Sequence, residues 1–306
     1  MRVSRRWGYI AAVVSAFFFG INSTFNKLAL TNVNPTLVAG LIYFIGGIVI
    51  FAIRASPLYK RIISLFGTEG TEKRFSKRNY VTLAVVIMCG SVLAPFLLLN
   101  GLAQTTATNA SLLLNAEVFF TFVIAFSFLK ERCSSREYWG ILLMLVAVLF
   151  VTTNGEFGSL SLTQNFLGNL LIVGSCFFWG VDNNLSKFLS VKTDIMTVTG
   201  AKCLIGGIAL LALCLILGLD LSVPLDALPY LLSVGTFSVA FSVLLYLFAL
   251  RKIGSMRTGV IFSMSSLFGV VLAFVVLGEA FTVLQASAGV LMLAGAYVVY
   301  RCGGKK

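Results

Sequence analysis

The feature that most constrains the fold is a series of ten apolar segments, each long enough to cross a lipid bilayer. A helix of about 20 residues spans the hydrocarbon core, and peptide groups inside that core must be hydrogen-bonded within the protein. Continuous apolar runs favour helices over a barrel, whose strands alternate between apolar and polar residues. We therefore predict an all-α integral membrane protein with ten transmembrane helices. The predicted spans are 8–29, 36–55, 80–101, 107–129, 136–153, 166–188, 195–218, 227–249, 256–278 and 283–301.

Composition excludes several classes of function. The chain is 58% hydrophobic and only 11% charged, so its main solvent is lipid. The net charge of +12 does not indicate nucleic acid, because the basic residues lie in short gaps between spans rather than on one soluble face. The absence of histidine removes histidine triads and histidine-ligated metals, and there is no phosphate-binding glycine loop. We expect no enzyme activity, no cofactor, no metal and no nucleic-acid partner.

Charge alternates from one gap to the next, as the positive-inside rule requires of a correct span count. The gaps on one side carry most of the basic residues, namely Arg2, Arg5, Arg6, Lys60, Arg61, Lys73, Arg74, Lys77, Arg78, Lys130, Arg132, Arg136, Lys187, Lys192, Arg251, Lys252, Arg257, Arg301, Lys305 and Lys306. The opposite gaps carry Glu156, Asp220, Asp226 and Glu279, and Lys27 is the basic residue near that side. Both termini are predicted to be cytoplasmic.

An internal repeat divides the chain into two halves, 1–155 and 156–306. Residues 15–27 align without gaps to residues 175–187, an offset of 160 residues, and 112–131 align with 260–279. Glycines continue the match in the second span of each half, where Gly40, Gly46 and Gly47 correspond to Gly200, Gly206 and Gly207. Each half holds five spans, and because five is odd the halves are predicted to be inverted repeats. Secondary transporters bind substrate between such repeats; a receptor or scaffold that arose by duplication is the alternative.

The chain resembles the tandem EamA-domain branch of the drug/metabolite transporter superfamily. The similar motifs are Phe-Phe-Phe-Gly20 and Phe-Phe-Trp-Gly180 in the first span of each half, the fourth-span ends at Glu131 and Glu279, and glycine-rich fifth spans. The resemblance implies movement of small solutes such as amino acids or nucleotide precursors, usually across the plasma membrane. The proline that usually follows a polar residue in the family's fourth span is absent, since the corresponding pairs are Glu117-Val118 and Ser265-Ser266.

Glu117 is the most informative single residue, because an ionisable group inside a span is a functional candidate. It lies near the middle of the fourth predicted span. Three roles stay open for it. The carboxyl group carries a coupling proton, anchors a substrate amine, or forms a structural hydrogen bond between helices.

A second group of candidates lies on the sixth and seventh spans. Asp182 lies one helical turn from Trp179 and Ser186, and Lys202 lies at a similar depth, so an intramembrane ion pair is expected. The pair either binds a zwitterion or neutralises itself for structure. Asn22 is the repeat counterpart of Asp182. Further polar or amphipathic candidates for the pathway are Asn26, Tyr43, Asn100, Asn115, Tyr246, Ser263, Ser265 and Ser266.

The sequence thus predicts a secondary transporter in the plasma (inner) membrane that moves a small polar metabolite, such as an amino acid, by alternating access. Export is the expected direction. Proton-coupled multidrug efflux is the rival transport function, and a non-transporting membrane scaffold or sensor is the rival from another class. The expected partners are a small-molecule solute and membrane lipid, with the protein a monomer or weak homodimer.

Overall fold

The structure of the protein, a computed structural model, contains helices joined by short turns and loops, and no strand, over the residues that it describes. These are 5–57, 59, 76–105, 107–129, 134–136, 138–143, 146 and 166–278, with 283, 287, 290, 291, 294, 295, 297 and 298. The elements are α1 (Arg5–Ala29), α2 (Pro35–Ala55), α4 (Lys77–Ile87), the π-helical segment η1 (Met88–Leu93), α5 (Ala94–Ala103), α6 (Ala107–Leu113), α7 (Ala116–Ser127), α9 (Phe166–Lys192), α10 (Ile195–Ile216), α11 (Leu228–Ser233), the π-helical segment η2 (Val234–Phe241), α12 (Ser242–Ile253), α13 (Ser255–Phe262) and α14 (Met264–Leu277).

Seven helices in this part of the chain are long and apolar enough to cross a membrane. They are Arg5–Ala29, Pro35–Ala55, Lys77–Ala103, Phe166–Ser190, Ile195–Ile216, Leu228–Ile253 and Ser255–Leu277. The prediction of a multi-pass, all-helical chain is confirmed. The fourth predicted span is divided between α6 and α7, and the predicted spans 136–153 and 283–301 lie largely outside the described residues. The count of ten spans, like the boundary between 155 and 156, stays a prediction.

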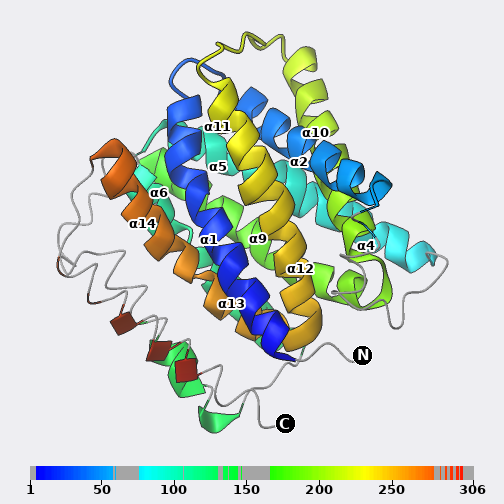
Figure 1. Ribbon diagram of the computed structural model, residues 1–306, viewed down its shortest axis with the longest axis vertical. Coiled ribbons are helices and arrows are strands. Elements are labelled where there is room, and N and C mark those ends of the chain that lie inside the picture. The colour runs from blue at the N-terminus through cyan, green and yellow to red at the C-terminus, as the bar shows by residue number, and fades with distance from the viewer. Residues whose placement is uncertain are drawn as a thin grey trace.

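Helices α2 and α10 pack side by side (Figure 1) because glycines let their backbones meet. A Cβ atom on Gly47 would lie 2.6 Å from the Cα of Leu204, and one on Gly207 would lie 2.7 Å from the Cα of Phe44. Positions 44 and 47 correspond to positions 204 and 207 by the offset of 160 residues. The two contacts are therefore reciprocal, which is the pattern that a two-fold relation between the helices produces.

The first helix of each half packs against helices of the other half. Helix α1 lies between α12 and α14 (Figure 1). Helix α9 packs in the corresponding way against α5 and α7. A Cβ on Gly20 would lie 2.6 Å from the Cβ of Phe268, and one on Gly180 would lie 2.8 Å from the Cβ of Phe120. These contacts also correspond across the repeat, so the halves interlock rather than meet at one flat face.

The fourth and ninth predicted spans are broken although neither has the family's proline. Between α6 and α7 a backbone hydrogen bond joins residues three positions apart instead of four: the N–H of Glu117 donates to the carbonyl of Leu114 at 3.1 Å. Between α13 and α14 the N–H of Ser266 donates to the carbonyl of Ser263 at 3.1 Å, and the Ser263 hydroxyl donates to the carbonyl of Val260 at 2.7 Å. Hydroxyl groups that bond to the preceding turn bend helices. Polar side chains and short turns thus replace proline here.

Lys27 lies beside the C-terminal end of α5. Its ammonium group donates to the carbonyls of Leu102, at 3.0 Å, and Thr105. Carbonyls in the last turn of a helix have no partner within the helix, and a cation near them is favourable. The basic residue that departs from the charge alternation therefore ties α1 to the end of α5.

Asp194 caps the N-terminus of α10, and its loss gives a first testable prediction. Its carboxylate accepts from the backbone N–H of Met196 at 3.3 Å and of Thr197 at 3.2 Å, while Arg54 lies 3.9 Å away. Asp194→Ala is expected to lower the free energy of unfolding by about 1 kcal/mol, because two helix N–H groups lose their acceptor. Asp194→Asn keeps the cap, and thermal unfolding in detergent should place it near the parent. An equal loss for Asn and Ala would instead assign the effect to the partly exposed Arg54 pair.

Candidate functional site

A cavity lies where helices of the two halves meet; its empty space measures about 690 Å³ when the space open to its surroundings is included. Elements α1, α2, η1, α5, α7, α9, α10, η2, α12 and α13 all contribute to its wall. The lining residues with polar or amphipathic side chains are Asn22, Tyr43, Ser91, Glu117, Trp179, Asp182, Asn183, Lys202, Ser238, Ser242 and Tyr246. The others are Phe19, Ile42, Gly90, Pro95, Leu98, Leu99, Cys203, Val239, Val243, Leu247 and Phe262. Seven of the predicted pathway residues therefore meet in one cavity: Asn22, Tyr43, Glu117, Trp179, Asp182, Lys202 and Tyr246.

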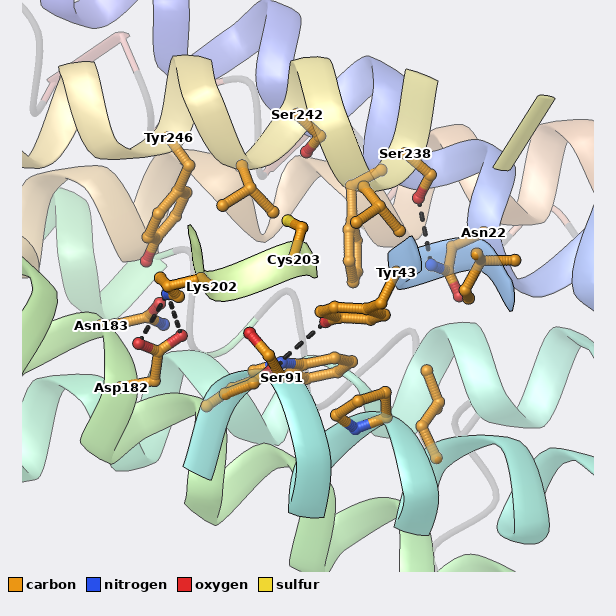
Figure 2. Close-up of a pocket in the computed structure, with 18 of the residues that line it drawn as sticks. Asn22, Tyr43, Ser91, Asp182, Asn183, Lys202, Cys203, Ser238, Ser242 and Tyr246 are labelled. Carbon is orange, nitrogen blue, oxygen red and sulfur yellow. Dashed lines mark hydrogen bonds and ion pairs between the residues drawn. The ribbon is translucent and has the colours of Figure 1, made fainter. Parts of the chain in front are cut away.

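A buried ion pair between α9 and α10 faces this cavity (Figure 2). The ammonium group of Lys202 lies 2.7 Å from each carboxylate oxygen of Asp182. Ser186 completes the group, since its hydroxyl donates to Asp182 at 2.7 Å and accepts from Lys202 at 3.2 Å. Lys202 is 3% exposed and Asp182 is 5% exposed. The ion pair expected from the sequence is present, and Ser186 lies behind it rather than in the cavity wall.

Gly90, in the π-helical segment η1, makes room for the Asp182 carboxylate. A Cβ atom at this position would overlap the carboxylate group and would lie 2.9 Å from the Cβ of Asp182. The carbonyl of Gly90 accepts from the hydroxyl of Tyr43 at 3.2 Å and from the indole N–H of Trp179 at 3.0 Å. π-Helical turns often occur at functional sites. Gly90 was missed by sequence reasoning, because a glycine within an apolar run is most simply interpreted as a packing residue.

Glu117 lies in the first turn of α7, immediately after the helix break, and is 6% exposed. The amide of Asn183 donates to its carboxyl group at 2.7 Å and to the hydroxyl of Thr121 at 3.2 Å. Glu117 lines the cavity. The N-terminal turn of a helix favours negative charge, so the helix break places this carboxyl group at an electrostatically favourable position. The carboxyl group still has acceptor capacity for an amine, and it is also suited to carry a proton.

Apart from the ion pair and Glu117, the described residues of the cavity lining include no acidic or basic side chain. The amide of Asn22 donates to the hydroxyl of Ser238 at 3.0 Å and accepts from Asn26 at 2.8 Å. Asn26 therefore supports Asn22 from outside the lining. Aromatic rings form part of the wall, with the Phe19 ring 5.8 Å from Trp179 and the Tyr246 ring 4.7 Å from Phe262 between centroids.

Five predicted pathway residues lie elsewhere. Asn100 bonds to the carbonyl of Phe96 at 2.8 Å and to Thr36 at 3.4 Å, and Asn115 is buried at the break between α6 and α7. Ser263 bonds back to its own helix, as described above. Ser265 and Ser266 line a separate, smaller space with Ser23 and Ser111. Helical periodicity could not distinguish these positions from the cavity-lining ones, because the separate space also lies between packed helices.

Comparison with known proteins supports the identification of a transporter. The chain is 37% identical over 297 residues to an uncharacterized transporter of Methanothermobacter thermautotrophicus, covering 97% of this chain and 87% of the relative. It is 26% identical to an uncharacterized transporter of Archaeoglobus fulgidus, over 80% of this chain and 83% of the relative. A protein of Salmonella typhimurium, named a probable amino-acid metabolite efflux pump, is 24% identical over 97% of this chain and 95% of its own length.

One solved crystal structure matches with a TM-score of 0.75, at 18% identity and with 96% of each chain covered, which shows a shared fold. Two regions, residues 6–153 and 166–301, each match the EamA-like transporter family. The two regions follow the two halves found by the internal repeat, and the family and the names of its members point to transport rather than catalysis. The chain belongs to the EamA-like transporter family.

Proposed function

We propose that this protein is a secondary transporter that moves a small polar metabolite, an amino acid or a related solute, through the central cavity. The observation that carries the proposal is the buried pair of Asp182 and Lys202 in the wall of a cavity shared by both halves. A zwitterion has the same two charges. Its carboxylate can therefore replace Asp182 beside Lys202 while its ammonium group faces Asp182, and no net charge is buried.

Alternating access is the mechanism that the packing supports. The reciprocal contacts between α2 and α10, and between α1 and α9 and their neighbours, fit two inverted repeats of five helices that rock about the cavity. The alternation of charge supports cytoplasmic termini in the plasma (inner) membrane. The name of the Salmonella relative supports export of amino-acid metabolites. A monomer, at most weakly dimerising, is the proposed functional unit, since each monomer contains both halves of the cavity wall.

Solute flux in reconstituted vesicles tests the proposed function. Purified protein in proteoliposomes should accelerate exchange of radiolabelled amino acids across the membrane, and a variant in which both members of the pair are neutralised, Asp182→Asn with Lys202→Met, should not. Flux of hydrophobic cationic dyes without flux of amino acids would favour multidrug efflux. The aromatic wall and the carboxyl group of Glu117 are the features that would suit such cations. Absence of any solute flux would favour a scaffold or sensor.

The role of Glu117 gives a further prediction. If its carboxyl group couples transport to protons, Glu117→Gln is expected to remove the dependence of uptake on a pH gradient while equilibrium exchange of substrate continues. Glutamine keeps the hydrogen bond to Asn183 but does not ionise. The measurement is uptake into proteoliposomes at several internal and external pH values. A pH dependence that Glu117→Gln leaves unchanged would exclude the coupling role and leave an anchor for the substrate amine.

A further inference from the structure

We infer that the cavity is a site with two unlike ends, one ionic and one uncharged, and that its substrates are neutral α-amino acids with apolar side chains. This inference rests on the proposed function and makes it more specific. It follows from which lining residues correspond to one another across the repeat.

The lining is almost symmetric in position but not in chemistry. With the offset of 160 residues for the first two spans of each half, and 148 residues for the third and fourth, 18 of the 22 lining residues form corresponding pairs. Asp182 corresponds to Asn22, and Lys202 corresponds to Ile42. Two equivalent ends of one cavity have therefore diverged, so that one carries an ion pair and the other an amide and an alkyl group.

The ionic end has a free hydroxyl group beside its charges. Figure 2 shows Ser91 between Tyr43 and the Asp182–Lys202 pair. Ser91 is 1% exposed, and its hydroxyl has no hydrogen-bond partner among the residues that the structure describes. A buried hydroxyl without a partner is unfavourable. A substrate carboxylate that accepts from both Lys202 and Ser91 satisfies this group, and the substrate ammonium then faces Asp182.

The uncharged end has little capacity for further polar contacts. Figure 2 places Asn22 and Ser238 at the end of the cavity opposite Asp182 and Lys202, and these two residues bond to each other. Ile42, Leu98 and Leu99 supply the apolar wall and are each at most 2% exposed. Helical side chains tilt toward the N-terminus of their helix, so Leu98 and Leu99 lean along α5 toward Ser91. When the head group of a bound amino acid lies at the ionic end, its side chain therefore contacts alkyl groups.

The two ends together discriminate among amino acids. An apolar side chain gains contact with the alkyl wall, whereas a charged side chain would be buried without a counter-ion at the Asn22 end. A solute that lacks one head-group charge would separate Asp182 from Lys202 and leave one of them without a replacement partner. Sites with buried polar groups reject such analogues strongly, because those groups are then left unpaired.

Competition for binding tests this inference on the unmodified protein. Binding of radiolabelled L-leucine to purified protein in detergent is measured against L-leucine, N-acetyl-L-leucine, L-leucinamide, L-lysine and L-glutamate. The acetyl and amide derivatives each remove one head-group charge. All four analogues are expected to compete at least about tenfold more weakly than L-leucine, a difference of about 1.4 kcal/mol in binding free energy.

A variant that adds a charge at the uncharged end tests the assignment of the two ends directly. Asn22→Asp places at this end the residue type that its counterpart, Asp182, already has. L-lysine is then expected to gain about tenfold in competition relative to L-leucine, because its side-chain ammonium finds a carboxylate. Asn100→Asp is the matched control, since Asn100 lies outside the cavity lining, and it should keep the parental preference.

The outcomes separate this inference from the proposed function. If amino acids are bound and transported but L-lysine or L-glutamate competes as strongly as L-leucine, the two-ended site is overturned and amino-acid transport still holds. Transport of other solutes without binding of any amino acid would overturn both. If Asn22→Asp does not fold, the ranking on the unmodified protein still decides.

Discussion

Lys202→Met is expected to abolish amino-acid transport and to lower the free energy of unfolding by about 3–5 kcal/mol, because it leaves the buried Asp182 carboxylate without its cation. Both carboxylate oxygens lose a contact of 2.7 Å, and the hydroxyl of Ser186, which donates to Asp182 at 2.7 Å, does not replace the lost cation. The measurements are thermal unfolding in detergent and exchange of labelled amino acids in proteoliposomes. Lys77→Met, at an exposed position at the start of α4, is the control and should change neither.

The double variant separates structure from recognition. Asp182→Asn combined with Lys202→Met removes both charges, so no buried charge is left alone, and much of the lost stability is expected to return. Transport should not return, because the zwitterion then finds neither partner. A double variant that transports at the parental rate would show that the pair serves only to hold α9 against α10.

Gly207→Ala is expected to destabilise the protein by more than about 2 kcal/mol, because the added methyl group would overlap the backbone of α2. Its Cβ would lie 2.7 Å from the Cα of Phe44, and a backbone cannot move aside as a flexible side chain can. The corresponding change, Gly47→Ala, meets the backbone of Leu204 and should have a similar effect. Similar losses at the two sites are expected because the contacts are reciprocal.

Gly174→Ala is the matched control for these two variants. Gly174 is also a helical glycine, but the nearest atom to its added Cβ is Leu97 Cδ1 at 3.5 Å, an ordinary contact. Alanine favours a helix over glycine by about 1 kcal/mol, so this variant should be neutral or stabilising. Thermal unfolding of the three variants in one detergent compares them directly. Parental stability in Gly207→Ala would mean that α2 and α10 are farther apart in the membrane.

The glycines at positions 47 and 207 show how far sequence reasoning reaches. Their correspondence was visible in the repeat, and small residues at such positions predict close helix approach. The partner helix could not be predicted, because small residues indicate a surface for close contact but not which helix packs against it. The structure supplies the answer that α2 meets α10, its own counterpart.

Some residues of the candidate site were likewise predicted from the sequence, and others were not. The Asp182–Lys202 pair was predicted because two opposite charges at one depth inside lipid must compensate each other. Gly90 and Ser91 were not predicted, since a π-helical turn depends on the local backbone and leaves no distinctive residue pattern. Ser265, the repeat counterpart of Glu117, was predicted to line the pathway, but it lines a different space.

The sequence by itself determined that the chain is helical and embedded in a membrane, that it consists of two similar halves and that it carries a compensated charge pair. Hydropathy, charge and repetition can all be read from the order of the residues, without knowledge of which residues are in contact. Only the tertiary structure decided that the helices break without proline, that α1 and α9 cross into the opposite halves, and that Asn22 and Ile42 occupy the end of the cavity opposite Asp182 and Lys202. Those features depend on which helix faces meet, and packing between distant segments sets that choice.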